Sequence, residues 1–141
     1  YRGILLMAKT LGLPMLCANP DIVVHWGDKL LYCAGALAQA YEKIGGTALY
    51  LGKPHPPIYD LARRRLGLLG LRDDAAILAI GDGIGTDIQG AMSENMDAVF
   101  IPGGIDATAF GAVSDTPNKD LLESWLAAKQ LSPSFAMGHL R

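Results

Sequence analysis

The stretch that decides the fold reads ILAIGDGIGTDIQG and spans residues 77–90. An apolar run ends at Gly81, and two aspartates, Asp82 and Asp87, follow it. A continuous apolar run is typical of a parallel strand that is covered on both faces. In sheets of parallel strands, ligands bind beyond the carboxyl ends of the strands. The two carboxylates are therefore predicted to lie at a ligand-binding edge of a parallel sheet.

The segments on either side of this stretch alternate between strand and helix patterns. Strands are predicted at 14–18, 47–51, 75–80 and 97–101. The first segment, YRGILLMAKTLGLP (1–14), is expected to be the second half of a helix that leads into a loop. Further helices are predicted at 34–46, 56–70, from Thr86, and after Thr116-Pro117, with Thr86 and Thr116 as N-caps. A loop is expected through Gly27, and a fraying tail is expected after Leu131. This alternation indicates an α/β fold with a mainly parallel sheet and flanking helices.

The composition excludes several classes of protein. Of 141 residues, half are hydrophobic, and 12 basic against 14 acidic residues give a net charge of −2, so nucleic acid is not an expected partner. No apolar stretch approaches the roughly 18 residues of a membrane span. The only cysteines, Cys17 and Cys33, form no CxxC motif. This usage predicts a reduced, cytoplasmic protein without a structural zinc site.

The turn after residue 80 fits a cation better than a nucleotide. Gly83 and Gly85 are followed by Ile88 where a dinucleotide-binding fingerprint needs a small residue, and no P-loop occurs. A carboxylate pair suits Mg²⁺, which usually joins one or two carboxylates to a substrate phosphate. The alternative is that Asp82 and Asp87 only cap a turn and a helix N-terminus.

Lys53 supplies the positive charge that such a site otherwise lacks. It lies between a predicted strand end and a helix that Pro56 and Pro57 begin. A lysine there can neutralise a phosphate or a nucleophilic carboxylate. A solvated surface lysine is the alternative.

These motifs together resemble those of a known family. GKPHPPIYDLA (52–62) followed by ILAIGDGIGTDIQGA (77–91) is similar to motifs three and four of the haloacid dehalogenase (HAD) superfamily of phosphohydrolases. The upstream LCANPD (16–21) and CAGALAQAYEKIGG (33–46) resemble the class IIA subclass, which carries a large α/β cap of the second type and includes NagD-like and p-nitrophenyl phosphatases. The resemblance covers about residues 13–105.

The resemblance implies roles for individual residues. Asp82 would bind Mg²⁺ directly, Asp87 would support the metal, and Lys53 would hold the nucleophilic aspartate and the phosphoryl group in line. Asn19 and Asp21 would face the active site from the cap, although a simple turn explains them equally well. His25 lies in the next loop, where substrate choice is usually made; a loop residue with no chemical role is the alternative.

The chain departs from the family in one respect. The reaction needs a nucleophilic aspartate in a DxD motif, and no DxD occurs here. The chain, which begins at Tyr1, is therefore expected to be the C-terminal portion of a phosphatase, with residues 1–51 from the cap and 52–141 from the catalytic core. It is expected to be inactive without the N-terminal half, which would supply the nucleophile.

The expected function of the whole protein is Mg²⁺-dependent hydrolysis of a small phosphorylated metabolite through an aspartyl-phosphate. The alternative is a non-catalytic module that binds a metal or a phosphate on the same fold. The phosphorylation domain of a cation pump, whose motif also contains GDG, is a third hypothesis, against which the NPD segment and the lack of a membrane span count. The sequence leaves homodimer formation open.

Overall fold

The computed structural model describes residues 1–27, 29–71, 76–110 and 116–140, and it has the predicted α/β class. Contacts divide the chain into two compact units, Tyr1–Asp60 and Leu61–Arg141. Each unit is described by itself below. The predicted boundary between cap and catalytic core, after residue 51, is a boundary between family domains. The contacts do not test it, and it stays a prediction.

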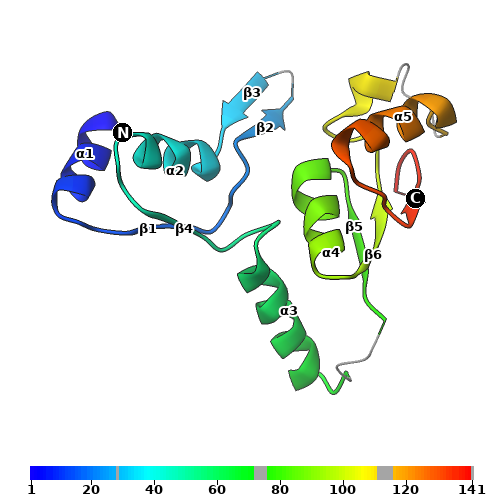
Figure 1. Ribbon diagram of the computed structural model, residues 1–141, viewed down its shortest axis with the longest axis horizontal. Helices are drawn as coiled ribbons and strands as arrows, with labels where there is room; N and C mark the ends of the chain where they lie inside the picture. The colour runs from blue at the N-terminus through cyan, green and yellow to red at the C-terminus, as the bar shows by residue number, and fades with distance from the viewer. Residues whose placement is uncertain (28, 72–75, 111–115, 141) are drawn as a thin grey trace. The chain divides into compact units, whose positions relative to one another are not determined.

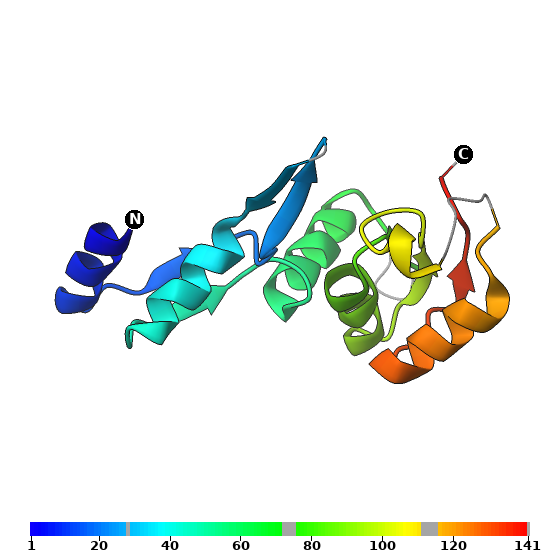
Figure 2. The ribbon, with the colours of Figure 1, turned by 90° about the horizontal axis from the view of Figure 1, so that it is seen from above.

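The first unit contains two small sheets and two helices (Figure 1). Its elements are α1 (Arg2–Thr10), β1 (Met15–Cys17), β2 (Val23–Trp26), β3 (Lys29–Tyr32), α2 (Ala34–Lys43) and β4 (Ala48–Tyr50). β1 and β4 pair in parallel, with Cys17 opposite Tyr50, and α2 contacts both strands (Figure 2). Tyr41 of α2 is buried, and its hydroxyl donates a hydrogen bond of 2.5 Å to the carbonyl of Leu13.

The segment predicted as a loop through Gly27 forms a hairpin instead. β2 and β3 pair antiparallel, with Val23 opposite Tyr32 and Trp26 opposite Lys29. Gly27, in the turn, has φ +58°, a conformation that costs glycine little. The sequence pattern hid these strands because β2 (VVHW) and β3 (KLLY) do not alternate between apolar and polar residues.

The helix α3 (Pro56–Leu68) crosses the division between the units. It begins at the proline pair, as predicted. None of its residues is buried, and its apolar residues Ile58 and Leu61 keep 37% and 42% of their surface exposed.

The second unit is a three-stranded parallel sheet with helices (Figure 1). Its elements are β5 (Leu78–Gly81), the π-helical turn η1 (Ile84–Ile88), α4 (Gln89–Ser93), β6 (Asp97–Phe100), the 3₁₀ turn η2 (Ala107–Phe110), α5 (Lys119–Lys129) and β7 (Phe135–Ala136). The strand order is β5-β6-β7, and Gly81 lies opposite Phe100. The carboxyl ends of β5 and β6 therefore meet at one edge of the sheet.

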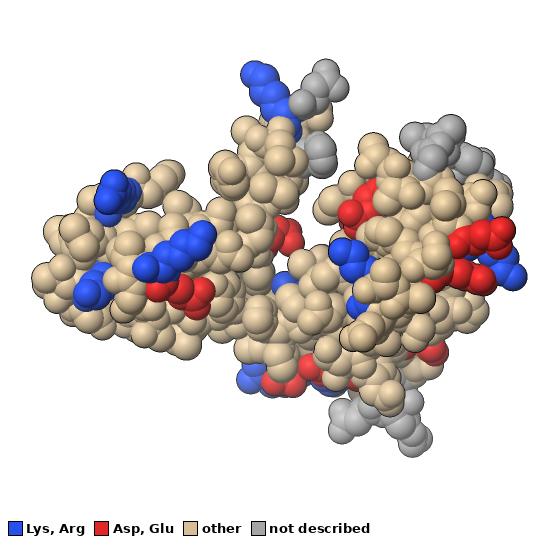
Figure 3. Space-filling model, turned by 45° about the horizontal axis from the view of Figure 1, so that its top comes forward, with Lys and Arg blue, Asp and Glu red and all other residues tan. Residues whose placement is uncertain are grey.

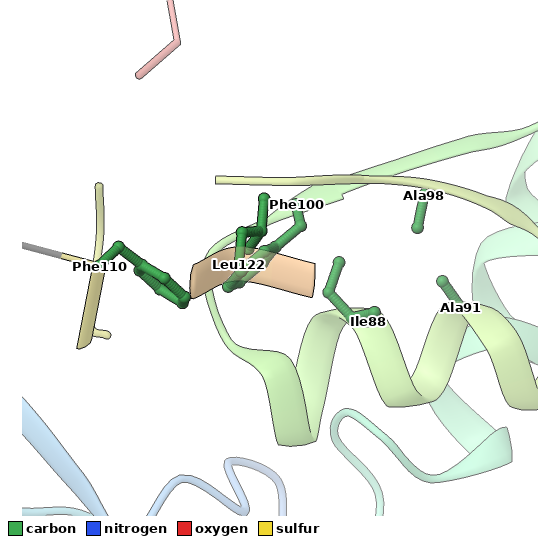
Figure 4. Close-up of a cluster of buried hydrophobic side chains, with 6 residues drawn as sticks. All are labelled: Ile88, Ala91, Ala98, Phe100, Phe110 and Leu122. Carbon is green, nitrogen blue, oxygen red and sulfur yellow. The ribbon is translucent and has the colours of Figure 1, made fainter. Parts of the chain in front are cut away.

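One apolar cluster holds the second unit together (Figure 4). Ile88 and Ala91 face β6, where the ring of Phe100 is fully buried. That ring stacks on Trp125 at a centroid distance of 5.9 Å and meets Phe110 edge-on at 6.2 Å. Aromatic pairs of this kind add about 0.5–1.5 kcal/mol to the stabilisation from burial alone.

β5 is less covered than the sequence suggests. Leu78 and Ile80 keep 48% and 51% of their surface exposed, and in the described part of the chain β5 pairs only with β6. The prediction of a strand covered on both faces is therefore wrong within this chain. Because proteins avoid long apolar unpaired edges, this side of the sheet is suited to a further strand.

Three predicted details of the second unit are also corrected. Gly83, not Thr86, is the N-cap of the turn that leads into α4. Asn118, not Thr116, caps α5, because its side-chain oxygen accepts the Leu121 N–H at 3.1 Å. The tail does not fray throughout, because Phe135 and Ala136 extend the sheet beside β6.

Removing the cap of α5 is expected to loosen the second unit. Because the Asn118 side chain satisfies a helix N–H that otherwise has no intrahelical partner, Asn118→Ala should lower the free energy of unfolding by about 1 kcal/mol. Asn118→Asp, which keeps the acceptor, should cost much less. Urea unfolding of the three proteins checks this, and equal losses for the two variants would contradict the capping role.

Candidate functional site

Asp82 and Asp87 lie together at the carboxyl end of β5, as predicted. Oδ2 of Asp82 accepts a hydrogen bond of 3.1 Å from the N–H of Ile105, in the loop after β6. Oδ2 of Asp87 accepts one of 3.0 Å from the N–H of Gly83. Both carboxylates are half-buried. Each is therefore held in place by the backbone of a loop at the ligand-binding edge of the sheet.

Two glycines make room for these carboxylates. A Cβ added at Gly104 would lie 2.1 Å from Oδ2 of Asp82, and one added at Gly81 would lie 2.2 Å from Cγ of Asp87. Real Cβ atoms do not approach other atoms so closely. A side chain at either position would displace the carboxylate.

A third carboxylate, Asp106, belongs to the same edge and was not predicted. Burial raises the pKa of Asp106, Lys129 acts to lower it, and the negative charge of Asp82 raises it further. The sequence carried a signal, because the segment GGID (103–106) lies in the loop that follows the strand next to β5. A search for acidic residues after each predicted strand finds it.

Neutralising Asp106 is expected to stabilise the second unit. The raised pKa means that the folded state holds the Asp106 proton more tightly than the unfolded state does. The charged form therefore opposes folding at neutral pH, and this penalty fades as the pH falls through the folded pKa toward the ordinary value. Asp106→Asn should raise the midpoint of thermal unfolding at pH 7, by a few degrees at most, and the difference should shrink toward pH 4. A variant less stable than the parent at pH 7 would contradict this.

The residues at this edge fit a hard divalent cation. Among the described residues, no three His, Cys, Asp or Glu side chains form a complete metal-binding group. Mg²⁺ needs no complete group, because it keeps several waters and is usually bound by one or two carboxylates together with a substrate phosphate. Asp82 and Asp87 offer such oxygen ligands, and a cation beside them would offset the repulsion between Asp82 and Asp106.

The capping alternative accounts for part of this geometry. The Asp87 carboxylate bonds to the backbone of its own turn, as a capping carboxylate does. Asp82 instead bonds to the loop after β6, away from the turn that follows it in sequence. Capping alone therefore does not explain the position of Asp82, and the metal-binding roles of the pair stay predictions.

The first unit brings together the other predicted segments. Lys53 is exposed, and it follows Gly52 in the loop after β4, where its peptide bond to Pro54 is cis. A Cβ on Gly52 would lie 2.4 Å from Cδ of Pro20 and 2.5 Å from the carbonyl oxygen of Ala18, so the two loops are in tight contact. The Lys53 loop and the turn of residues 18–21 therefore lie side by side at the carboxyl ends of β4 and β1.

Asn19 and Asp21 stabilise that turn. The Asn19 side-chain oxygen accepts the N–H of Asp21 at 3.1 Å, which is the pattern of an Asx turn. The carbonyl of Asp21 accepts the N–H of Gly35 at 3.1 Å, at the start of α2. These contacts give Asn19 a structural role, and substrate binding by either residue stays a prediction.

The three histidines lie in different surroundings. His25 is in β2, and its side chain lies outside what the structure describes. The ring of His55 stacks on Tyr50. His139 lies against Gly103, because a Cβ added at Gly103 would be 2.8 Å from Nε2 of His139. The C-terminal residues thus contact the loop that carries Gly104 and Asp106.

The surface charge of the protein is mixed. Basic and acidic side chains are scattered among uncharged ones on the face shown in Figure 3. Among the residues that the structure describes, no helix combines the length and the apolar character that a membrane crossing requires.

Comparison with known proteins identifies the family. The family model for HAD-hydrolase-like proteins matches residues 50–126, which include Lys53, Asp82 and Asp87. A haloacid dehalogenase-like hydrolase from Brucella suis 1330 is 36% identical, with a TM-score of 0.71, over 100% of this chain and 49% of that one. Curated protein sequences give no match.

Two more distant solved structures extend the comparison. A p-nitrophenyl phosphatase from Archaeoglobus fulgidus is 22% identical, and the match covers 93% of this chain and 45% of that one. Its TM-score of 0.65 shows that the two folds are alike. The glycerol phosphate phosphatase Rv1692 from Mycobacterium tuberculosis, solved in complex with calcium, is 26% identical over 75% of this chain and 31% of that one, with a TM-score of 0.58.

The chain thus spans half or less of the length of these structures. The family match covers more than half of the chain and includes the loop with Lys53 and the edge with the two aspartates. The chain belongs to the haloacid dehalogenase-like hydrolases.

Proposed function

We propose that this chain is part of a Mg²⁺-dependent phosphatase that hydrolyses phosphate monoesters. The observation that carries the proposal is the pair Asp82 and Asp87, fixed by backbone N–H groups at the carboxyl end of a parallel strand. The phosphatases among the structural relatives support this reaction class. A sugar or nucleotide phosphate is the substrate class that we infer.

The proposed roles divide between the two loops. Asp82 would bind the cation directly, and Asp87 would bind it through water or orient its ligands. When bound, Mg²⁺ offsets negative charge on the phosphoryl group. Lys53 would neutralise the nucleophilic carboxylate and hold it in line with the phosphorus atom.

The reaction has two steps. A carboxylate outside this chain attacks phosphorus, the bond between phosphorus and the ester oxygen breaks, and the ester oxygen takes a proton from water and leaves as the alcohol. Water then attacks the aspartyl-phosphate, which releases inorganic phosphate and restores the carboxylate. The intermediate thereby divides one difficult displacement by water into two easier steps.

Exposed apolar residues on both units are suited to pack against the segment that would supply the nucleophile. Leu16 and Leu49, opposite each other on β1 and β4, remain 64% and 47% exposed, and Leu78 and Ile80 of β5 are half exposed. Faces of this kind suit packing against further elements. We propose that the N-terminal half of a longer protein covers them.

Asn19, Asp21 and His25 would contribute to substrate choice from the side of the cap. The proposed enzyme is cytoplasmic.

The test is phosphate release from a broad panel of phosphate monoesters. The protein to assay comprises this chain joined to a segment with the DxD motif, with Mg²⁺ and with a chelator. We expect Mg²⁺-dependent release, and negligible release from residues 1–141 alone. No release from any ester would contradict the proposal.

A non-catalytic module is the second candidate, because the chain itself contains no DxD motif. It predicts cation or phosphate binding without turnover even when the chain is extended. The ester panel therefore distinguishes the two functions.

A further inference from the structure

We propose that Tyr50 and His55 act as a positioning pair for Lys53. The inference rests on the proposed function, in which the Lys53 ammonium group must meet a carboxylate and a phosphoryl group at fixed places. A lysine has a long, flexible side chain, so its charge is well placed only if its backbone is held. All the contacts that carry the inference lie within the first unit.

The pair closes the loop that carries Lys53. Tyr50 is the last residue of β4, and His55 follows the intervening residues 51–54. The two rings stack with centroids 5.1 Å apart and planes inclined by 20°. Inside the loop, the His55 N–H donates to the carbonyl of Gly52 at 3.0 Å. The two ends of the Lys53 loop are thus tied together by side chains as well as by backbone.

Tyr50 is itself anchored from two directions. Its hydroxyl donates a 2.8 Å hydrogen bond to Oε2 of Glu42 on α2. Burial and this bond raise the pKa of Tyr50 to about 12. Its backbone is held beside β1, because the N–H of Leu51 donates to the carbonyl of Cys17 at 2.9 Å. The ring therefore offers a fixed surface on which the imidazole of His55 rests.

Gly52, which precedes Lys53, packs tightly against Pro20. A Cβ on Gly52 would lie 2.4 Å from Cδ of Pro20, so the loop is in close contact with its neighbour there. Gly52 before Lys53 and His55 after it are thus both held, while Lys53 itself is exposed. Loss of the stack should therefore affect the placement of the Lys53 charge more than the contacts that bind substrate.

The test uses turnover in the protein that comprises this chain and the nucleophile-bearing segment. His55→Ala should lower kcat by about 10- to 100-fold, as small misplacements of catalytic groups do, with KM changed less than about twofold. His55→Phe, which keeps a flat ring over Tyr50, should restore most of the loss. In a Lys53→Ala background, His55→Ala should have no further effect, because the group it positions is gone.

Two outcomes of this assay would overturn the inference. One is an unchanged kcat in His55→Ala, and the other is an equal further loss in the Lys53→Ala background. Failure of the proposed function would give a different result from failure of the positioning role. Either the parent protein would release no phosphate, or Lys53→Ala would leave its phosphate release unchanged.

A measurement on residues 1–141 keeps the inference testable without turnover. The ¹⁵N relaxation of the Lys53 amide should show increased motion in His55→Ala and near-parental values in His55→Phe. A Lys53 amide that is equally ordered in all three proteins would overturn the positioning role.

Discussion

Replacement of Asp82 by Asn is expected to abolish phosphate release by the protein that contains this chain. The substitution keeps the size of the side chain and an oxygen that can accept the Ile105 N–H, but it removes the negative charge. A cation held by one or two carboxylates loses a large share of its binding energy when one of them becomes neutral. Loss of cation stabilisation at the phosphoryl group is worth several kcal/mol, so kcat/KM should fall by about 10³-fold or more.

The matched control is Asp120→Asn, an exposed aspartate in the first turn of α5. It makes the same chemical change at a residue without a proposed catalytic role and should leave kcat/KM within about twofold of the parent. The parent and both variants are compared at several Mg²⁺ concentrations. Full activity of Asp82→Asn would show that Asp82 does not bind the cation, since a carboxamide cannot replace the charge.

Truncation of Phe100 is expected to unfold the second unit. The ring is fully buried and packs against Phe110 and Trp125 in the aromatic part of the core. Phe→Ala at such a site removes transfer free energy and leaves a cavity, for a cost of about 3–5 kcal/mol. Because total stabilities of small domains are about 5–15 kcal/mol, Phe100→Ala should leave the unit marginal or unfolded.

Phe135→Ala is the control, because the ring of Phe135 on β7 is 61% exposed. Its loss should cost about 1 kcal/mol or less. Urea unfolding can be followed by Trp125 fluorescence in a Trp26→Phe background, since these are the only two tryptophans. Similar destabilisation by Phe100→Ala and Phe135→Ala would contradict the assignment of the core.

The sequence predicts most of what the second unit uses to place its carboxylates. The apolar run before Asp82 and the strand at 97–101 have enough length and apolar character to indicate parallel strands. The edge at which their ends meet then follows from topology. Asp106 belongs to no family motif and lies six residues beyond the end of β6, so the sequence pattern alone does not single it out.

The misses have physical reasons. The hairpin of β2 and β3 escaped notice because its strands carry apolar residues without alternation. The exposure of Leu78 and Ile80 depends on which elements cover β5, and no local pattern encodes that. The cap of α5 was misplaced by two residues, because Thr116 and Asn118 are both good N-caps and only the bond from Leu121 distinguishes them. That Lys53 and Asp82 serve the same site is implied by the family resemblance and stays a prediction.

Asp82 and Asp87 are expected to form a divalent-cation site. Paramagnetic broadening of the ¹⁵N–¹H spectrum of this chain by Mn²⁺ tests it most directly, because it detects weak binding and needs neither substrate nor nucleophile. We predict broadening that begins at the lowest Mn²⁺ concentrations, and is strongest, at residues 81–87 and 103–106. Mg²⁺ should reverse it, and Asp82→Asn should remove it. Sharp signals from these residues in the presence of Mn²⁺, or broadening centred on Glu94 and Asp97, would contradict the account.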